Sequence, residues 1–296
     1  MRTENQTPVR PPLNLAALRA AVNWAANRAA VRTGGLWRAI EVVESTGSTN
    51  ADLLARALEG EPEGTVLATE DQRAGRGRLG RAWLTPPRAA LTFSLLVRPD
   101  VPPAKRGWLP LLTGVAVAGA ITSVTGVETR LKWPNDVLAA QGKLVGILAE
   151  GAGDAIVVGI GVNVSTEPGE LPDRGPGALP AASLLTAGAK PEALDRTPLL
   201  LAILDEFERR YLAWREAAGD PEASGLRAAY VERSGTIGRQ VRAELPGGQA
   251  LSGLAIGVDA DGRLLVRSSS ATEQAGAADP VGSVAAVAAA DVVHLR

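Results

Sequence analysis

Glycine and arginine alternate in the segment Gly75–Trp83, which reads GRGRLGRAW. Glycine lets the backbone turn tightly and approach a ligand closely. Arginine presents a planar, permanently charged group that matches phosphate or carboxylate oxygens. The composition therefore predicts a loop that closes over an anion, with Arg76, Arg78 and Arg81 as its candidate contacts; a solvated basic loop is the plain structural alternative.

Residues 75–80 also fit the G-x-G-x-x-G pattern of dinucleotide-binding loops. In those folds the glycine-rich loop opens a helix. Here Pro86 and Pro87 follow, and then an apolar run typical of a strand. The context therefore argues against a nicotinamide dinucleotide site.

The motif KWPNDV (132–137) combines a cation, an amide and a carboxylate at one turn. Lys132 is a candidate to neutralise phosphate. Asp136 is a candidate magnesium ligand, because Mg²⁺ is commonly bound by one or two carboxylates together with phosphate oxygens. Asn135 is a candidate to orient either group, and the Trp–Pro step predicts an extended entry into the turn.

Two apolar motifs, KLVGILAE (143–150) and GIGVNV (159–164), carry glycines at strand positions. Glycine inside a strand often marks the close approach of a ligand, which makes Gly146 and Gly159 candidates for the floor of a pocket. Lys143 opens the first motif and Asn163 lies in the second. The chain contains only four lysines among its 31 basic residues, so a lysine in each of two nearby motifs indicates a need for a compact ammonium group.

Composition removes several classes of function. The 296-residue chain has no cysteine, which excludes disulfides, thiolate metal sites and cysteine nucleophiles, and its single histidine argues against a Ser-His-Asp triad. A net charge of −1 predicts no general attraction to DNA. The start of the chain does not read as a signal peptide, and the uncharged stretch 107–127 reads as a buried helix, so we expect a cytoplasmic protein without a membrane span.

The motifs require a mixed α/β framework. Apolar runs predict strands over 36–44, 65–70, 91–98, 128–133, 143–150 and 155–164, and helical spacing predicts helices over 12–33, 48–60, 105–125, 198–218 and 222–233. A loop is expected over 165–181. Short strands with turns at 246–248 and 259–262 follow residue 235. We expect an N-terminal helical arm (1–36), a catalytic domain (37–234) and a small β-barrel (235–296).

The motifs STGSTN (45–50), EDQRAGRGRLGRAW (70–83), KWPNDV, KLVGILAE and GIGVNV occur in the order and approximate spacing of the bacterial biotin–protein ligases. The sequence resembles a short form of that family without the N-terminal DNA-binding domain. The resemblance implies the α+β biotin–lipoate ligase fold, similar to class II synthetases: a mixed, largely antiparallel sheet with helices on one side, followed by an SH3-like β-barrel.

The resemblance also implies site residues. The biotin side is formed by Ser48, Thr49, Asn50, Gln72, Gly75, Arg76, Gly77, Arg78, Lys143, Gly146 and Gly159. The ATP side is formed by Arg76, Arg78, Arg81, Trp83, Lys132, Asn135, Asp136 and Asn163. Lys143, Arg78 and Lys132 are the expected catalytic residues, and Asp136 is the expected magnesium ligand.

Biotin, ATP with Mg²⁺ and a biotin carboxyl carrier domain are the partners that the resemblance implies, without a tightly bound prosthetic group. Biotin is joined to AMP with release of pyrophosphate and is then transferred to a carrier lysine. A monomer or weak homodimer without DNA binding is expected. Two alternatives stay open: a lipoate or octanoate ligase of the same architecture, and a biotin-responsive repressor.

Overall fold

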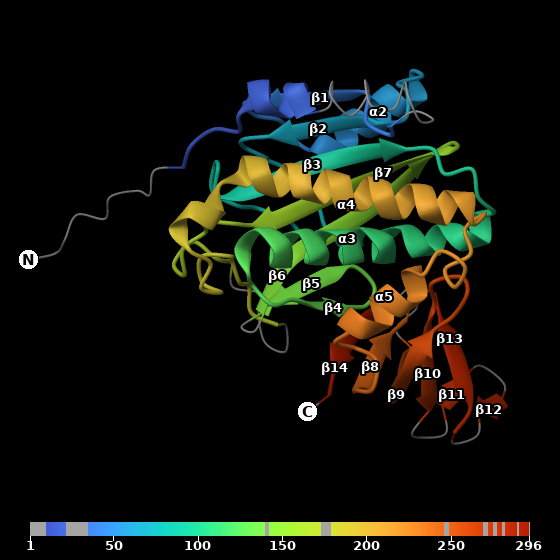
Figure 1. Cartoon of the computed structure of the whole chain (residues 1–296). Helices are drawn as coiled ribbons and strands as arrows, with labels where there is room; N and C mark the ends of the chain where they lie inside the picture. Colours follow the sequence, from blue (N-terminus) through green and yellow to red (C-terminus); the bar gives the residue numbers. More distant parts are fainter. Residues whose placement is uncertain are drawn as a thin grey trace, which may run out of the picture.

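The computed structural model describes residues 10–21, 35–139, 142–172, 179–245, 249–268, 272–274, 277–279, 282–288 and 290–295. Its centre is a seven-stranded sheet (Figure 1). In spatial order the strands are β1 (Ala39–Val43), β2 (Thr65–Thr69), β3 (Ala90–Val97), β7 (Ala155–Asn163), β6 (Gly142–Ala152), β5 (Asp136–Ala139) and β4 (Arg130–Lys132). β1 and β2 are parallel and the other neighbours are antiparallel, which confirms the predicted mixed sheet.

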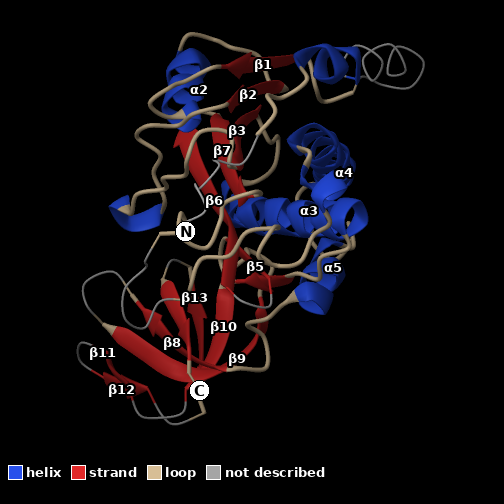
Figure 2. Ribbon diagram, turned by 90° about the vertical axis from the view of Figure 1, so that its left-hand side faces the viewer, coloured by secondary structure: helices blue, strands red, loops and turns tan. Residues whose placement is uncertain are grey.

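Three helices cover one face of this sheet: α3 (Trp108–Thr125), α4 (Arg196–Glu216) and α5 (Leu226–Arg233) (Figure 2). α3 is uncharged and packs between α4 and strands β4 to β6. Among the described helices, the segment Pro103–Thr125 is long and apolar enough to cross a membrane, but it is mostly buried inside the protein. This confirms the prediction of a buried core helix.

The short helix α2 (Thr49–Leu58) lies on the opposite face and is the exception to the one-sided arrangement. The side chain of Ser48 caps it by accepting a hydrogen bond from the Ala51 backbone N–H. Leu53 packs against Leu67 and Leu96 in a second, smaller apolar cluster. α2 therefore shares its face of the sheet with the strand positions that carry the predicted site.

The N-terminal segment packs on the central domain. Residues 15–21 are helical, and Leu13 and Leu18 are buried in the main core. The remainder of the helix predicted over 12–33 lies outside the described residues. The described part is therefore attached to the central domain.

A second sheet follows α5. Its strand order is β13 (Val284–Val287), β10 (Leu264–Ser268), β9 (Ala250–Val258), β8 (Gln240–Glu244) and β14 (Asp291–His294), all antiparallel. β11 (Thr272–Gln274) pairs with β12 (Ala277–Asp279). The described strands form a small antiparallel sheet that is consistent with the predicted SH3-like barrel, but with β13 and β14 at its ends these strands do not close into a barrel. The turn predicted at 259–262 joins β9 to β10, whereas the one at 246–248 lies outside the described residues.

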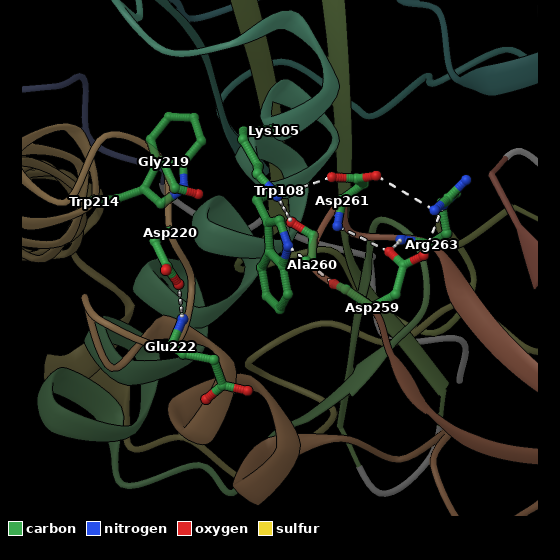
Figure 3. A network of polar contacts seen from close by, with 10 residues as sticks. All are labelled: Lys105, Trp108, Trp214, Gly219, Asp220, Glu222, Asp259, Ala260, Asp261 and Arg263. Carbon is green, nitrogen blue, oxygen red and sulfur yellow. Dashed lines mark hydrogen bonds and ion pairs between the residues drawn. The ribbon is translucent and has the colours of Figure 1, made fainter.

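The turn between β9 and β10 fastens this sheet to the central domain (Figure 3). The indole N–H of Trp108 donates to the Asp259 carbonyl at 3.2 Å, and Lys105 Nζ lies 3.0 Å from Asp261 Oδ1. The indole of Trp133 donates to the Gly262 carbonyl at 3.0 Å. Since Trp133 belongs to KWPNDV, the position of the C-terminal sheet is tied to a motif of the site.

Candidate functional site

Cross-strand rows of small residues form the floor of the site. One row consists of Asp136 on β5, Gly146 on β6, Gly161 on β7 and Thr92 on β3, which are successive partners in register. A Cβ atom on Gly146 would lie 2.9 Å from the indole of Trp83, and one on Gly161 would lie 2.4 Å from its Nε1. These glycines therefore leave room for a flat group directly above the sheet.

The neighbouring row contains Gly159, paired with Ser94 on β3 and Leu148 on β6. A Cβ atom at Gly159 would lie 2.3 Å from Asn50 Oδ1. Asn50 is the second residue of α2, so the glycine allows the start of this helix to approach the sheet. The two predicted glycines thus allow different close contacts: Gly146 with the indole of Trp83, and Gly159 with the side chain of Asn50.

A network of buried polar groups joins α2 to the sheet. The Thr49 backbone N–H donates to Gln72 Oε1 at 3.0 Å, and the Thr49 hydroxyl lies 2.7 Å from that of Ser94. The Ser94 hydroxyl donates to Asn50 Oδ1 at 2.6 Å. Asn50 Nδ2 in turn donates to Glu150 Oε2 at 2.7 Å. The network fixes a set of hydrogen-bonding groups at one end of the pocket.

A β-bulge directs Lys143 into the site. The register between β5 and β6 shifts so that Val137 faces Val145 while Leu138 faces Lys143. Leu144 and Val145 are both buried in the core, which leaves Lys143 and Gly146 on the pocket side. Lys143 Nζ lies 2.6 Å from Asp136 Oδ1, and both side chains are 13% exposed. This ion pair joins two residues that the sequence assigns to different substrates.

The arginine–glycine loop crosses above this floor. Arg78 NH1 donates to Asn135 Oδ1 at 3.3 Å and NH2 donates to the Ala290 carbonyl of the C-terminal sheet at 3.2 Å. Leu79 has a φ of +57°, a left-handed conformation that is uncommon outside glycine, and its side chain is exposed. Arg78 therefore connects the loop, the KWPNDV turn and the second domain.

These elements enclose a cavity of about 440 Å³, a size usual for small-molecule sites. Of the predicted residues, the cavity is lined by Ser48, Thr49, Asn50, Gln72, Arg76, Gly77, Arg78, Arg81, Trp83, Lys132, Asn135, Asp136, Lys143, Gly146, Gly159 and Asn163. Gly75 is the predicted residue that does not line it. A Cβ atom there would lie 2.2 Å from the Trp83 carbonyl oxygen, so Gly75 shapes the loop.

Two predicted residues lie in contacts that the sequence did not indicate. Trp83, expected on the ATP side, lies above Gly146 of the expected biotin side, so the two sides meet at its ring. Asn163 is buried and donates from Nδ2 to the Ala182 carbonyl at 2.9 Å. Its amide thus anchors the segment after residue 179 while the residue lines the cavity.

Magnesium would find one carboxylate here. Among the described lining residues, Asp136 is the acidic one, and the described residues hold no group of three potential metal-binding side chains. Mg²⁺ in nucleotide sites usually keeps several waters and is bound through one or two carboxylates together with substrate phosphates. The donor set therefore fits a magnesium ion that arrives with a nucleotide and touches Asp136, rather than a permanently bound metal.

Comparison with known proteins assigns this architecture. Residues 40–166 match the biotin/lipoate A/B protein ligase family, and residues 236–294 match the biotin protein ligase C-terminal domain. A biotin–[acetyl-CoA-carboxylase] ligase from Mycobacterium tuberculosis is 44% identical over 294 residues, 97% of this chain and 98% of that protein. The chain belongs to the biotin/lipoate protein ligase family.

Other members of this ligase family are also similar. A bifunctional ligase/repressor from Bacillus subtilis is 33% identical over 81% of this chain and 71% of that protein. The fold resembles that of the Aquifex aeolicus biotin protein ligase in complex with biotin and ATP, with a TM-score of 0.69 over 88% of this chain and 100% of the other at 24% identity. The predicted fold class is therefore confirmed.

Sequence reasoning missed several residues that line the ligase pocket or support its lining residues. Ser94 is a polar residue in the apolar run 91–98, and Thr92 shares its face, so their alternation was an available signal. Leu148 adds apolar lining on the face of Gly146, whereas Phe93 and Ile147 border the cavity with their side chains in the main core. Glu150 was included in a motif but given no role, although it accepts from Asn50.

His294 lies beside the site rather than in it. Its Nε2 lies 3.0 Å from the Thr236 hydroxyl, which also accepts a hydrogen bond from the Trp133 backbone N–H. Burial, followed by the positive charges of Lys132 and Arg239, lowers the pKa of His294 to about 4. The imidazole is therefore neutral near pH 7 and supports the KWPNDV turn without acting as a cation.

Proposed function

We propose that this protein is a biotin–protein ligase that forms biotinyl-5′-AMP from biotin and ATP and then transfers biotin to a lysine of a carrier domain of acetyl-CoA carboxylase or a related carboxylase. The observation that carries the proposal is one cavity with a fixed polar network at one end and the cations Arg78, Lys132 and Lys143 along it. Similarity to a biotin–[acetyl-CoA-carboxylase] ligase over 97% of the chain supports the substrate.

The polar end suits the head of biotin. Its ureido ring offers two N–H donors and one carbonyl acceptor, and Thr49, Asn50 and Gln72 present hydroxyl and amide groups of both kinds. Beside it the indole of Trp83, seated on Gly146 and Gly161, offers a flat apolar surface to the bound acid. The apolar side chain of Leu148, on the same face of β6 as Gly146, suits the sulfur-containing ring and the alkyl chain.

The cationic end suits the activation step. An oxygen of the biotin carboxylate attacks the α-phosphorus of ATP, a mixed anhydride forms and pyrophosphate leaves. Two anions must meet, so Lys143, Lys132 and Arg78 lower their repulsion and stabilise the charge that spreads over the phosphate oxygens. Magnesium bound with ATP would supply further positive charge near Asp136. The Lys143–Asp136 pair keeps the ammonium oriented.

The second step requires no nucleophile from the enzyme. The ε-amino group of the carrier lysine attacks the acyl carbon of the anhydride, an amide forms and AMP leaves. The loop around Arg78 covers the cavity and lowers the access of water to the anhydride. A chain without cysteine is compatible with this chemistry.

A lipoate or octanoate ligase is the second candidate, because the matching family model includes lipoate ligases. We further propose a cytoplasmic monomer or weak homodimer without DNA binding, with an N-terminal arm to residue 36, a catalytic domain to 234 and a C-terminal domain from 235. The net charge of −1 supports the absence of DNA binding, which a mobility shift on operator-like DNA tests.

Transfer to a carrier tests the function. The protein is incubated with ATP, magnesium, biotin and a biotin carboxyl carrier domain, and the carrier mass is measured. One added biotinyl group is expected, and none on a carrier whose target lysine is replaced by arginine. Transfer of lipoate but not biotin would support the second candidate and contradict the proposal.

A further inference from the structure

The N-terminal segment makes a specific contact with the loop that follows β7. Arg10 reaches Glu170 with both terminal nitrogens, one of them 3.2 Å from Oε1, and also donates to the Ser165 carbonyl at 3.0 Å. The Arg10 side chain is only 7% exposed. The hydrogen bond from Arg10 is the main cause that lowers the pKa of Glu170, so the carboxylate is ionised near neutral pH.

The same segment also holds the residue at which the arginine–glycine loop begins. The Leu13 backbone N–H donates to Glu70 Oε1 at 2.6 Å. Glu70 Oε2 lies 2.7 Å from Arg196 NH2, and this nitrogen also donates to the Pro11 carbonyl. Glu70 and Arg196 are almost fully buried. The backbone of the N-terminal segment is therefore part of a buried charged cluster.

Both contacted segments lead directly into the pocket. Glu70 precedes the loop that carries Arg76, Arg78 and Trp83. The Arg88 backbone N–H donates to the Glu70 carbonyl at 2.7 Å, so both ends of this loop meet at Glu70. The segment 165–172 continues β7 and contributes Pro172 to the cavity lining. The N-terminal segment thus contacts both the residue at which the arginine–glycine loop begins and the segment that follows β7.

Apolar anchors fix this stretch in place. Leu13 and Leu18 are buried in the main core, and the Asn14 backbone N–H donates to Thr197 Oγ1 at 3.0 Å. Because the segment is packed into the core and hydrogen-bonded to Thr197 of α4, these contacts oppose a displacement of either loop. A segment that only covered apolar surface would not need the buried ion pair and hydrogen bonds that this segment makes.

We propose that residues 10–18, here named the N-terminal clasp, position the arginine–glycine loop and the 165–172 loop relative to each other and so slow the escape of the activated intermediate. Arg10 is a positioning residue in this account, since it does not line the cavity. The inference rests on the proposed function, because the intermediate is the acyl adenylate formed there.

The test compares Arg10→Met with Arg227→Met in the full chain. Arg227 forms an arginine–glutamate pair with Glu222 at 2.6 Å on the distant α5 and is the matched control. The lifetime of the enzyme-bound adenylate is measured after free ligands are removed, together with hydrogen exchange in residues 71–83 and 165–172. Loss of the charged hydrogen bonds of Arg10 is expected to shorten the lifetime about tenfold and to speed exchange in both loops, with no change in the control.

A charge swap adds a rescue. Arg10→Glu combined with Glu170→Arg restores an ion pair and is expected to recover much of the lifetime that Arg10→Glu alone loses. If Arg10→Met does not fold, Glu170→Gln replaces it, because that variant keeps the bond from Arg10 to Ser165.

If Arg10→Met has the same adenylate lifetime and the same hydrogen exchange in the two loops as Arg227→Met, the proposal of the clasp is wrong. If the wild type forms no adenylate at all, the proposed function fails instead, and exchange in the two loops still decides whether the clasp positions them.

Discussion

Adding one methyl group at Gly159 tests the geometry of the biotin end. In Gly159→Ala the new Cβ would lie 2.3 Å from Asn50 Oδ1 and 2.9 Å from its Cγ, distances that real Cβ atoms do not tolerate. Asn50 is 5% exposed and short, so it has little freedom to withdraw. The substitution is therefore expected to displace the Asn50 side chain from its network.

The magnitude follows from the bonds that Asn50 loses. Displacement breaks the hydrogen bond from Ser94 at 2.6 Å and the one to the Glu150 carboxylate at 2.7 Å. A neutral hydrogen bond contributes about 1 kcal/mol and one to a charged group about 1.5 to 3 kcal/mol. These bonds hold Asn50 in its binding position, so with partial relaxation that conformation is disfavoured by about 2 to 3 kcal/mol in the variant, which lowers biotin affinity roughly 30- to 150-fold.

Isothermal titration with biotin measures this loss, and Gly151→Ala is the control. Gly151 lies on β6, and a Cβ atom there would meet nothing within 4 Å. The control is expected to bind biotin within about twofold of the wild type. Wild-type affinity in Gly159→Ala, or an equal loss in both variants, would refute the placement of biotin beside Asn50.

Three further changes probe the rest of the site. Lys143→Met leaves Asp136 buried without its cation, and we expect a fall of at least about 100-fold in pyrophosphate release, measured in a single turnover. Arg78→Ala loses its contacts to Asn135 and Ala290 and should shorten the adenylate lifetime about tenfold, measured by chase with unlabelled biotin. As the pH falls from 6.5 to about 4, unfolded chains bind a proton at His294 that the folded protein does not, so stability falls by up to about 1.4 kcal/mol per pH unit. His294→Asn should remove this part of the slope in urea unfolding, and an unchanged slope would contradict the lowered pKa.

Much of the site could be predicted because its signals are local. Gly146 and Gly159 stand out within short apolar runs, and alternation along a strand places every second residue on one face. Ser48 precedes a helical run and caps it, and serine at such a position is a common local signal of a helix start. The strands and helices could be recognised for the same reason, since hydrophobic periodicity is a property of neighbouring residues.

The rest depended on contacts between distant residues. Strand β5 has four residues inside and just after the KWPNDV motif, too few for a pattern of alternation. The pairing of Lys143 with Asp136 depends on a bulge, for which the adjacent core residues Leu144 and Val145 are only a faint signal. Arg10 and Glu170 are 160 positions apart, and nothing near either residue indicates its partner.

Pyrophosphate release in the absence of any carrier protein tests the central claim most directly. The protein is mixed with ATP, magnesium and either biotin or lipoate, and the pyrophosphate formed per protein molecule is measured. The account predicts a biotin-dependent burst of about one equivalent, because the cavity forms one adenylate and retains it. Release with lipoate alone, or no release with either acid, would contradict it.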